Sequence, residues 1–150
     1  MKRTLLAALV AIVLFVPRPG FAHCQMPCGI YDDPGRIAQL KEDSATIAKA
    51  VTTINELAGK TDAQSWNQVV RWTNTKEEHA SAIIDVVAEY FLLQRVKTVA
   101  AGSEGYADYL AKLADHHAVM VAAMKVKQTV SPESVAALDA AIAALAKRYP

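Results

Sequence analysis

Six residues near the N-terminus bring together two thiols and an imidazole. His23, Cys24 and Cys28 lie in the sequence His-Cys-Gln-Met-Pro-Cys at 23–28. If the chain is cut after Ala22, His23 contributes a free α-amine directly beside the amide nitrogen of Cys24. Two nitrogens and two thiolates then form a planar donor set, which suits Ni(II) or Cu(II) better than tetrahedral Zn(II). The imidazole of His23 remains for an axial position, so the sequence predicts a metal-binding hook.

The segment before this hook has the features of an export signal. Lys2 and Arg3 precede an apolar run of 12 residues at 5–16, and small residues occupy the −3 and −1 positions of a cleavage site after Ala22. A membrane-spanning helix needs about 20 apolar residues, so the run is too short for an anchor. We therefore expect residues 1–22 to be a cleaved signal peptide and the mature protein to be periplasmic or extracellular.

The remaining chain, 23–150, is long enough for one domain with a substantial core. Three of the 16 basic residues, Lys2, Arg3 and Arg18, would leave with the signal, so 13 basic residues would face 15 acidic ones. A formal charge of −2 without a basic motif argues against a nucleic-acid partner. No second long apolar run follows, so we expect no stable membrane anchor after cleavage.

The two cysteines also allow a different chemistry, because exported proteins meet an oxidising compartment. A Cys24–Cys28 disulfide would enclose three residues and so constrain the unfolded chain only weakly. A structural bundle with this small disulfide is one alternative to a metal hook. A redox catalyst of the Cys-x-x-x-Cys type is another, although the chain lacks the strand–helix pattern of thioredoxin-like proteins.

The elements that must position the hook are helices, because apolar residues recur at three- and four-residue steps. Four helices are predicted: about 35–58, about 61–99, a third that starts behind Gly102-Ser103, and a fourth that opens at 131. No alternating run long enough for a strand occurs, and the connections are short. The sequence therefore predicts an all-α fold, an up-down four-helix bundle.

The buried faces of these helices follow from the same spacing. The predicted apolar positions are Ile37, Leu40, Ile47, Val51, Ile54 and Leu57 in the first helix; Trp66, Val69, Thr73, Ala80, Ile83, Val87 and Phe91 in the second; Tyr106, Leu110, Leu113, His117, Met120 and Met124 in the third; and Val135, Leu138, Ile142 and Leu145 in the fourth.

Two helix starts and one histidine pair carry further predictions. Thr61 and Gln64 form a capping box for the second helix, and Ser131 caps the fourth. His116 and His117 point about 100° apart on a helix and therefore do not share a metal. We expect His117 to lie in the core and His116 to be exposed.

The residues of the hook and their order resemble the nickel-containing superoxide dismutases. The mature N-terminus of that family is His-Cys-x-x-Pro-Cys-Gly-x-Tyr, and residues 23–31 match every fixed position. The segments Lys76-Glu77-Glu78 and Tyr90-Phe91 also look like the second helix of the family. The resemblance implies a four-helix bundle that assembles into a homohexamer.

By this resemblance, one nickel ion per subunit is bound by the amine and imidazole of His23, the amide nitrogen and thiolate of Cys24, and the thiolate of Cys28. Tyr31 would lie near the open axial face and order water or the incoming anion. The implied reaction converts superoxide to oxygen and hydrogen peroxide as nickel cycles between Ni(III) and Ni(II). The catalytic residues would be His23, Cys24, Cys28 and Tyr31.

The chain departs from the family pattern where the axial imidazole should be oriented. Well-known members carry an arginine after the Lys-Glu-x segment, and His79 occupies that position here. The first helix has no obvious match to the family's glutamate: Gln39 lies near the expected place and Glu42 one turn later, so Glu42 and His79 are both candidates. A non-catalytic protein that binds nickel or copper through the same hook remains the alternative function.

Overall fold

The computed structural model describes residues 32–150, which form helices and no strand. The elements are α2 (Asp33–Leu57), α3 (Ala63–Asp85), the π-helix η1 (Val86–Arg95), α4 (Tyr106–Gln128) and α5 (Pro132–Ala146).

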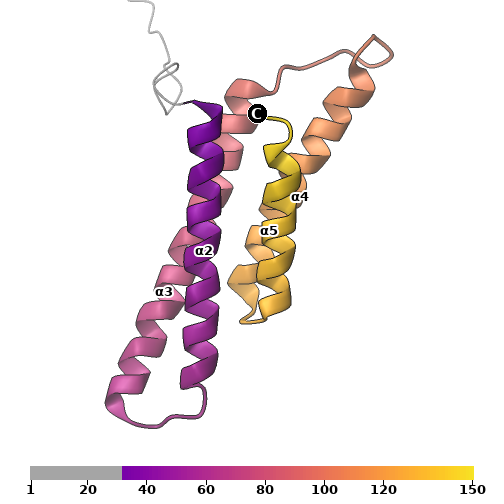
Figure 1. Cartoon of the computed structure of the whole chain (residues 1–150). Helices are drawn as coiled ribbons and strands as arrows, with labels where there is room; N and C mark the ends of the chain where they lie inside the picture. The colour runs from indigo at the N-terminus through magenta and orange to yellow at the C-terminus, as the bar shows by residue number, and fades with distance from the viewer. Residues whose placement is uncertain (1–31) are drawn as a thin grey trace, which may run out of the picture.

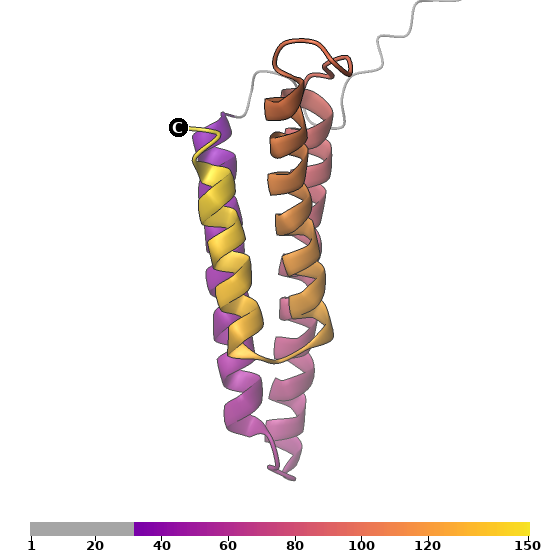
Figure 2. The same ribbon diagram turned by 90° about the vertical axis from the view of Figure 1, so that its right-hand side faces the viewer.

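The four long helices pack as an up-down bundle, as the sequence predicts. α2 packs on α3, α3 on α4, α4 on α5, and α5 closes the ring against α2. Successive helices run in opposite directions (Figures 1 and 2), so α2 begins at the end of the bundle where α3–η1 and α5 finish. We call this end the root end, because the hook joins α2 there. The α2–α3 hairpin extends beyond the α4–α5 turn at the opposite end (Figure 1).

Side chains that cap the backbone fix where the helices begin. The Asp32 carboxylate accepts from Gly35 N, Asp62 accepts from Ser65 N, and the Ser131 hydroxyl accepts from Ser134 N. The Ser131 cap is thus confirmed. The predicted Thr61–Gln64 capping box is wrong by one residue, because the carboxylate of Asp62 reaches the first turn.

The second helix differs from the prediction in its last part. It was expected to continue regularly to about Val99, but after Asp85 the chain winds into η1 and ends at Arg95. The backbone N–H of Val96 donates to the carbonyl of Phe91, five residues earlier, which closes the last π turn. Residues 96–105 then connect η1 to α4.

The core lies along the bundle axis. Its fully buried large side chains include Leu40 and Ile47 of α2, Ile83 of α3, Phe91 of η1, and Leu138, Ile142 and Leu145 of α5. The predicted faces of the first and fourth helices are therefore confirmed, apart from the half-buried Leu57. Trp66, by contrast, is 60% exposed, so its predicted place in the second buried stripe is wrong.

The predicted face of the third helix is correct only in part, because Met120 packs against the core and Leu113 is half-buried. α4 buries His116, Val119, Ala123 and Val126, whereas Leu110 and Met124 are exposed. Apolar residues occur on several sides of this helix, so two parallel stripes satisfy the same helical spacing. His116 is fully buried and His117 is exposed, the reverse of the prediction.

None of the helices between residues 32 and 150 is long and apolar enough to cross a membrane.

Candidate metal centre

All four residues predicted to form the site, His23, Cys24, Cys28 and Tyr31, lie outside the described residues, as does the predicted signal segment. What the structure describes is the surface around the start of α2, which we call the platform. This platform starts at Asp32, the residue directly after Tyr31.

Asp32 and Asp33 form the root of the hook. Asp32 Oδ1 accepts a hydrogen bond of 2.6 Å from Gly35 N. A methyl group on Gly35 would lie 2.6 Å from the same oxygen, so a side chain at this position would require the Asp32 carboxylate to shift. Asp33 Oδ1 accepts from Tyr90 Oη at 2.8 Å, and Asp33 Oδ2 accepts from Arg95 Nη2 at 2.6 Å. Both oxygens of one carboxylate thus join the start of α2 to η1.

The platform around this root is aromatic and partly buried. The Tyr90 ring meets Phe91 edge-on at 5.0 Å between centroids, and the Arg36 guanidinium lies 5.6 Å from the Tyr90 ring centre. Burial, aided by the neighbouring Asp33 carboxylate, raises the pKa of the Tyr90 phenol to about 12. Tyr90 therefore remains a proton donor to Asp33 at any physiological pH.

The C-terminal residues pack into the same cluster. The Tyr149 ring lies 4.5 Å from Phe91, and its hydroxyl is 2.8 Å from His116 Nε2. Arg148 pairs with Asp115 and Asp108 at 2.8 Å each. The end of the chain is therefore tied to α4 and η1 close to the hook root.

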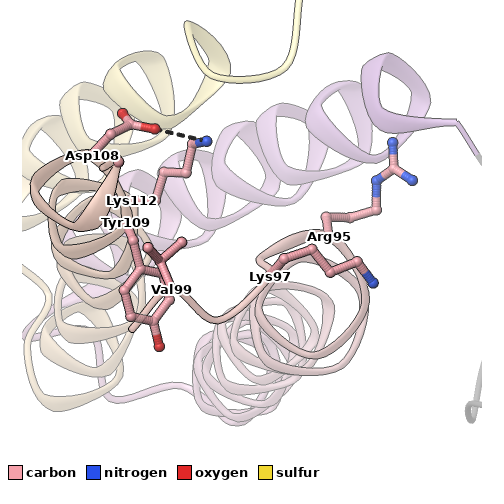
Figure 3. Close-up of a pocket in the computed structure, with 7 residues that line it drawn as sticks. Arg95, Lys97, Val99, Asp108, Tyr109 and Lys112 are labelled. Atoms are coloured by element: carbon pink, nitrogen blue, oxygen red, sulfur yellow. Dashed lines mark ion pairs between the residues drawn. The ribbon is translucent and has the colours of Figure 1, made fainter. Parts of the chain in front are cut away.

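A cavity of about 260 Å³ opens beside the root, between the end of η1 and the start of α4. It is lined by Arg95, Lys97, Val99, Gly105, Asp108, Tyr109 and Lys112. Figure 3 shows Arg95 and Lys97 on one side and the Asp108–Lys112 ion pair on the other, at 2.9 Å between the charged atoms. Of the three cations in this lining, Arg95 is paired with Asp33 and Lys112 with Asp108, so their charges are balanced by carboxylates.

Residues 32–150 contain no group of three or more histidine, cysteine, aspartate or glutamate side chains arranged to hold a metal. The only cysteines of the chain are Cys24 and Cys28. Thiolate ligands for a metal can therefore come only from the hook. Thiolates are soft ligands, and nickel is among the metals that accept them together with nitrogen donors.

The two candidates for orienting the axial imidazole behave differently. His79 Nδ1 lies 2.6 Å from Asp43 Oδ1, and Asp43 is almost fully buried. Glu42 is exposed and is not the partner of His79. The carboxylate beside His79 is therefore that of Asp43, one residue after Glu42 on α2. The resemblance to the family did not point to Asp43.

Sequence reasoning also missed Asp33 and Arg95. Asp33 reads as an ordinary acidic residue in a first helical turn, and Arg95 as a cation near a helix end. Their pairing depends on contact between segments 62 residues apart, which no local pattern reveals.

The described residues form a helical bundle, and both cysteines of the chain precede its first described residue. The sequence model of one family, described as nickel-containing superoxide dismutase, matches residues 19–150. The chain therefore belongs to the nickel-containing superoxide dismutases, which are oxidoreductases acting on superoxide. Searches among curated proteins and solved structures return no match.

Proposed function

We propose that the protein is an exported superoxide dismutase whose single nickel ion per subunit is held by the hook. The ligands are the amine and imidazole of His23, the amide nitrogen and thiolate of Cys24, and the thiolate of Cys28. The observation that carries this proposal is the family match, which includes residues 23–31 as well as the bundle.

The length of the chain between ligands and root supports a site at the root end. Cys28 is four residues from Asp32, so an extended chain spans at most about 14 Å between their Cα atoms. A metal bound by Cys28 therefore lies within reach of Tyr90, Arg95 and the cavity. His23 is nine residues from Asp32, a span of at most about 30 Å.

The residues of the chain have separate tasks in this proposal. When bound, nickel supplies the one-electron steps that oxidise one superoxide and reduce the next. Lys97, which lines the cavity beside the Lys112–Asp108 ion pair, attracts the superoxide anion toward the root end, an effect that salt would weaken. Tyr31 orders water or the incoming anion with its hydroxyl.

Before it is active, the protein is exported and its subunits assemble. Cleavage between Ala22 and His23 in the periplasm or outside the cell frees the amine that the metal needs. The mature chain assembles as a homohexamer, by family resemblance. Such an assembly would cover apolar side chains that the single chain exposes, among them Trp66 and Val70, which are 60% and 55% exposed.

The test is intact mass and metal analysis of the protein purified from its native compartment with nickel supplied. A chain that begins at His23, carries about one nickel per subunit and dismutates superoxide would support the proposal. A matched variant, Cys28→Ser, should retain the bundle and lose the nickel. A chain that keeps residues before His23, or has a Cys24–Cys28 disulfide and no metal, would overturn it. Nickel or copper bound without turnover would instead favour the non-catalytic metal-binding protein.

A further inference from the structure

The carboxylate of Asp33 is placed to control how the hook leaves the bundle. Asp33 is the first residue of α2, and its side chain is only 16% exposed. One oxygen accepts from the Tyr90 phenol and the other from the Arg95 guanidinium, over sequence separations of 57 and 62 residues. A carboxylate engaged on both oxygens by a buried phenol and a cation has little freedom to turn.

The π-helix explains how two residues of one element reach one carboxylate. Tyr90 and Arg95 are five residues apart, and on an α-helix such residues point about 140° away from each other. A π turn closes its hydrogen bonds over five residues instead, which brings the directions of residues i and i+5 closer together. The turn that contains Tyr90 and Arg95 lies within η1, Val86–Arg95. The π geometry thus directs both donors toward the start of α2.

Asp32 and Asp33 fix different features of the same junction. The Asp32 cap to Gly35 sets where helical backbone begins, while Asp33 holds that first turn against η1. These contacts therefore fix both the position and the direction of the first turn of α2, to which residues 28–31 connect. A shift of this start by 1 Å would move any site built on the next few residues by a similar amount.

We propose that Asp33, Tyr90 and Arg95 form a clamp, the root clamp, that positions the hook for metal retention and turnover. These three are positioning residues and do not touch the metal or the substrate. The inference rests on the proposed function, because it assigns the clamp to a hook that binds nickel.

The experiment compares Asp33→Asn and Arg95→Met with the wild-type protein, each matured to His23 and loaded with nickel. Arg95→Lys is the conservative variant, and Arg71→Met is the control, since Arg71 is an exposed arginine on α3. Three quantities are measured: the rate at which nickel passes to a chelator, the turnover number at saturating superoxide, and the midpoint of thermal unfolding. Amide exchange at residues 35–37 of the metal-free proteins gives a readout that needs no nickel.

The clamp predicts nickel release at least tenfold faster in Asp33→Asn and Arg95→Met, because loss of the groups that support metal ligands typically costs about 10–100-fold in metal affinity. Amide exchange at 35–37 should also rise in both. Arg95→Lys should recover part of the loss, and Arg71→Met should match the wild type. Nickel release and amide exchange within twofold of wild type in both clamp variants would overturn the inference. A wild-type protein that neither holds nickel nor turns over would instead count against the proposed function.

Discussion

At the scale of single residues, the bundle buries one lysine almost completely. The Lys76 side chain is 3% exposed, and its ammonium donates to the carbonyls of Val126 and Lys127 at 2.7 Å each. Those carbonyls belong to the last turn of α4 and have no partner within the helix. Glu77 balances the charge at 2.7 Å. Lys76 therefore serves as a cap supplied by a neighbouring helix.

Replacing Lys76 by methionine should destabilise the bundle by about 1.5–3 kcal/mol, since two carbonyls lose a charged donor. Urea unfolding followed by circular dichroism measures the change. Lys49→Met, at an exposed position of α2, is the matched control and should have little effect. Equal midpoints for the two variants would contradict the capping role.

His116 is a second ionisable residue that the bundle buries. Its Nδ1 lies 2.6 Å from the carbonyl of Lys112, which can only accept, so Nδ1 carries the proton. Nε2 then accepts from the Tyr149 hydroxyl. Burial lowers the pKa of His116 below its ordinary value of 6.5, outweighing the opposite effect of nearby Asp115. The His116 imidazole is therefore held in its neutral form in the folded protein.

This shift predicts acid sensitivity with a definite sign. Below pH 6.5 the unfolded chain binds a proton that the folded His116 resists, so stability falls as pH decreases through that range. We expect His116→Gln to reduce the loss of unfolding free energy between pH 7.5 and 5.5. His117→Gln, the exposed neighbour, should leave the pH dependence unchanged. Identical pH profiles for both variants would disprove the assignment.

The histidine pair shows what the sequence could not determine. Spacing alone allowed either histidine to face the core, because apolar residues line α4 on several sides. Contacts between distant segments decide the question: the rings of Phe91 and Tyr149 pack around His116, at 5.9 and 5.7 Å between centroids. The hook motif, by contrast, is local in sequence, so it could be recognised without any tertiary information.

At the scale of elements, helix starts could be predicted to within a residue or two, because capping is a local interaction. Ser131 was identified directly, and the start of α3 was missed only in the choice between Thr61 and Asp62. The π-helix could not be foreseen. Its sequence contains ordinary helix formers, and the five-residue closure accompanies the contacts that Tyr90 and Arg95 make with α2.

The start of α3 offers a direct comparison of the two candidate caps. Asp62 Oδ1 accepts from Ser65 N at 2.9 Å and Oδ2 from Ser65 Oγ at 2.6 Å, and these bonds lower the pKa of the carboxyl. Asp62→Ala should lower the midpoint of thermal unfolding by several degrees, and Thr61→Ala should leave it nearly unchanged. A larger effect from Thr61→Ala would restore the original capping prediction.

At the scale of the whole molecule, the four-helix bundle could be predicted because short connections leave few ways to bury four amphipathic helices. The surface could not be predicted in the same way. Trp66 and Val70 lie one turn apart on α3 and are both largely exposed. Exposed apolar groups of this kind favour contact with another chain.

If the proposed hexamer covers this part of α3, Trp66→Lys should reduce the assembled mass without lowering the stability of the individual bundle. Light scattering coupled to size-exclusion chromatography measures the mass over a range of concentrations. Asn67→Lys adds the same charge at the exposed neighbouring residue and keeps the tryptophan, so it serves as the control. An unchanged mass for Trp66→Lys would place the subunit contact elsewhere.

The order in which the helices pack bears on whether the bundle folds before its thiols are oxidised. Three of the four helix contacts join elements that follow each other along the chain, and only α2 and α5 must meet from afar. Proteins dominated by such local contacts fold within microseconds to milliseconds, whereas thiol oxidation takes seconds to hours. Both cysteines precede residue 32 in the sequence, and the helices that pack all follow it. We therefore expect metal and oxidant to compete for the thiols of a bundle that has already folded.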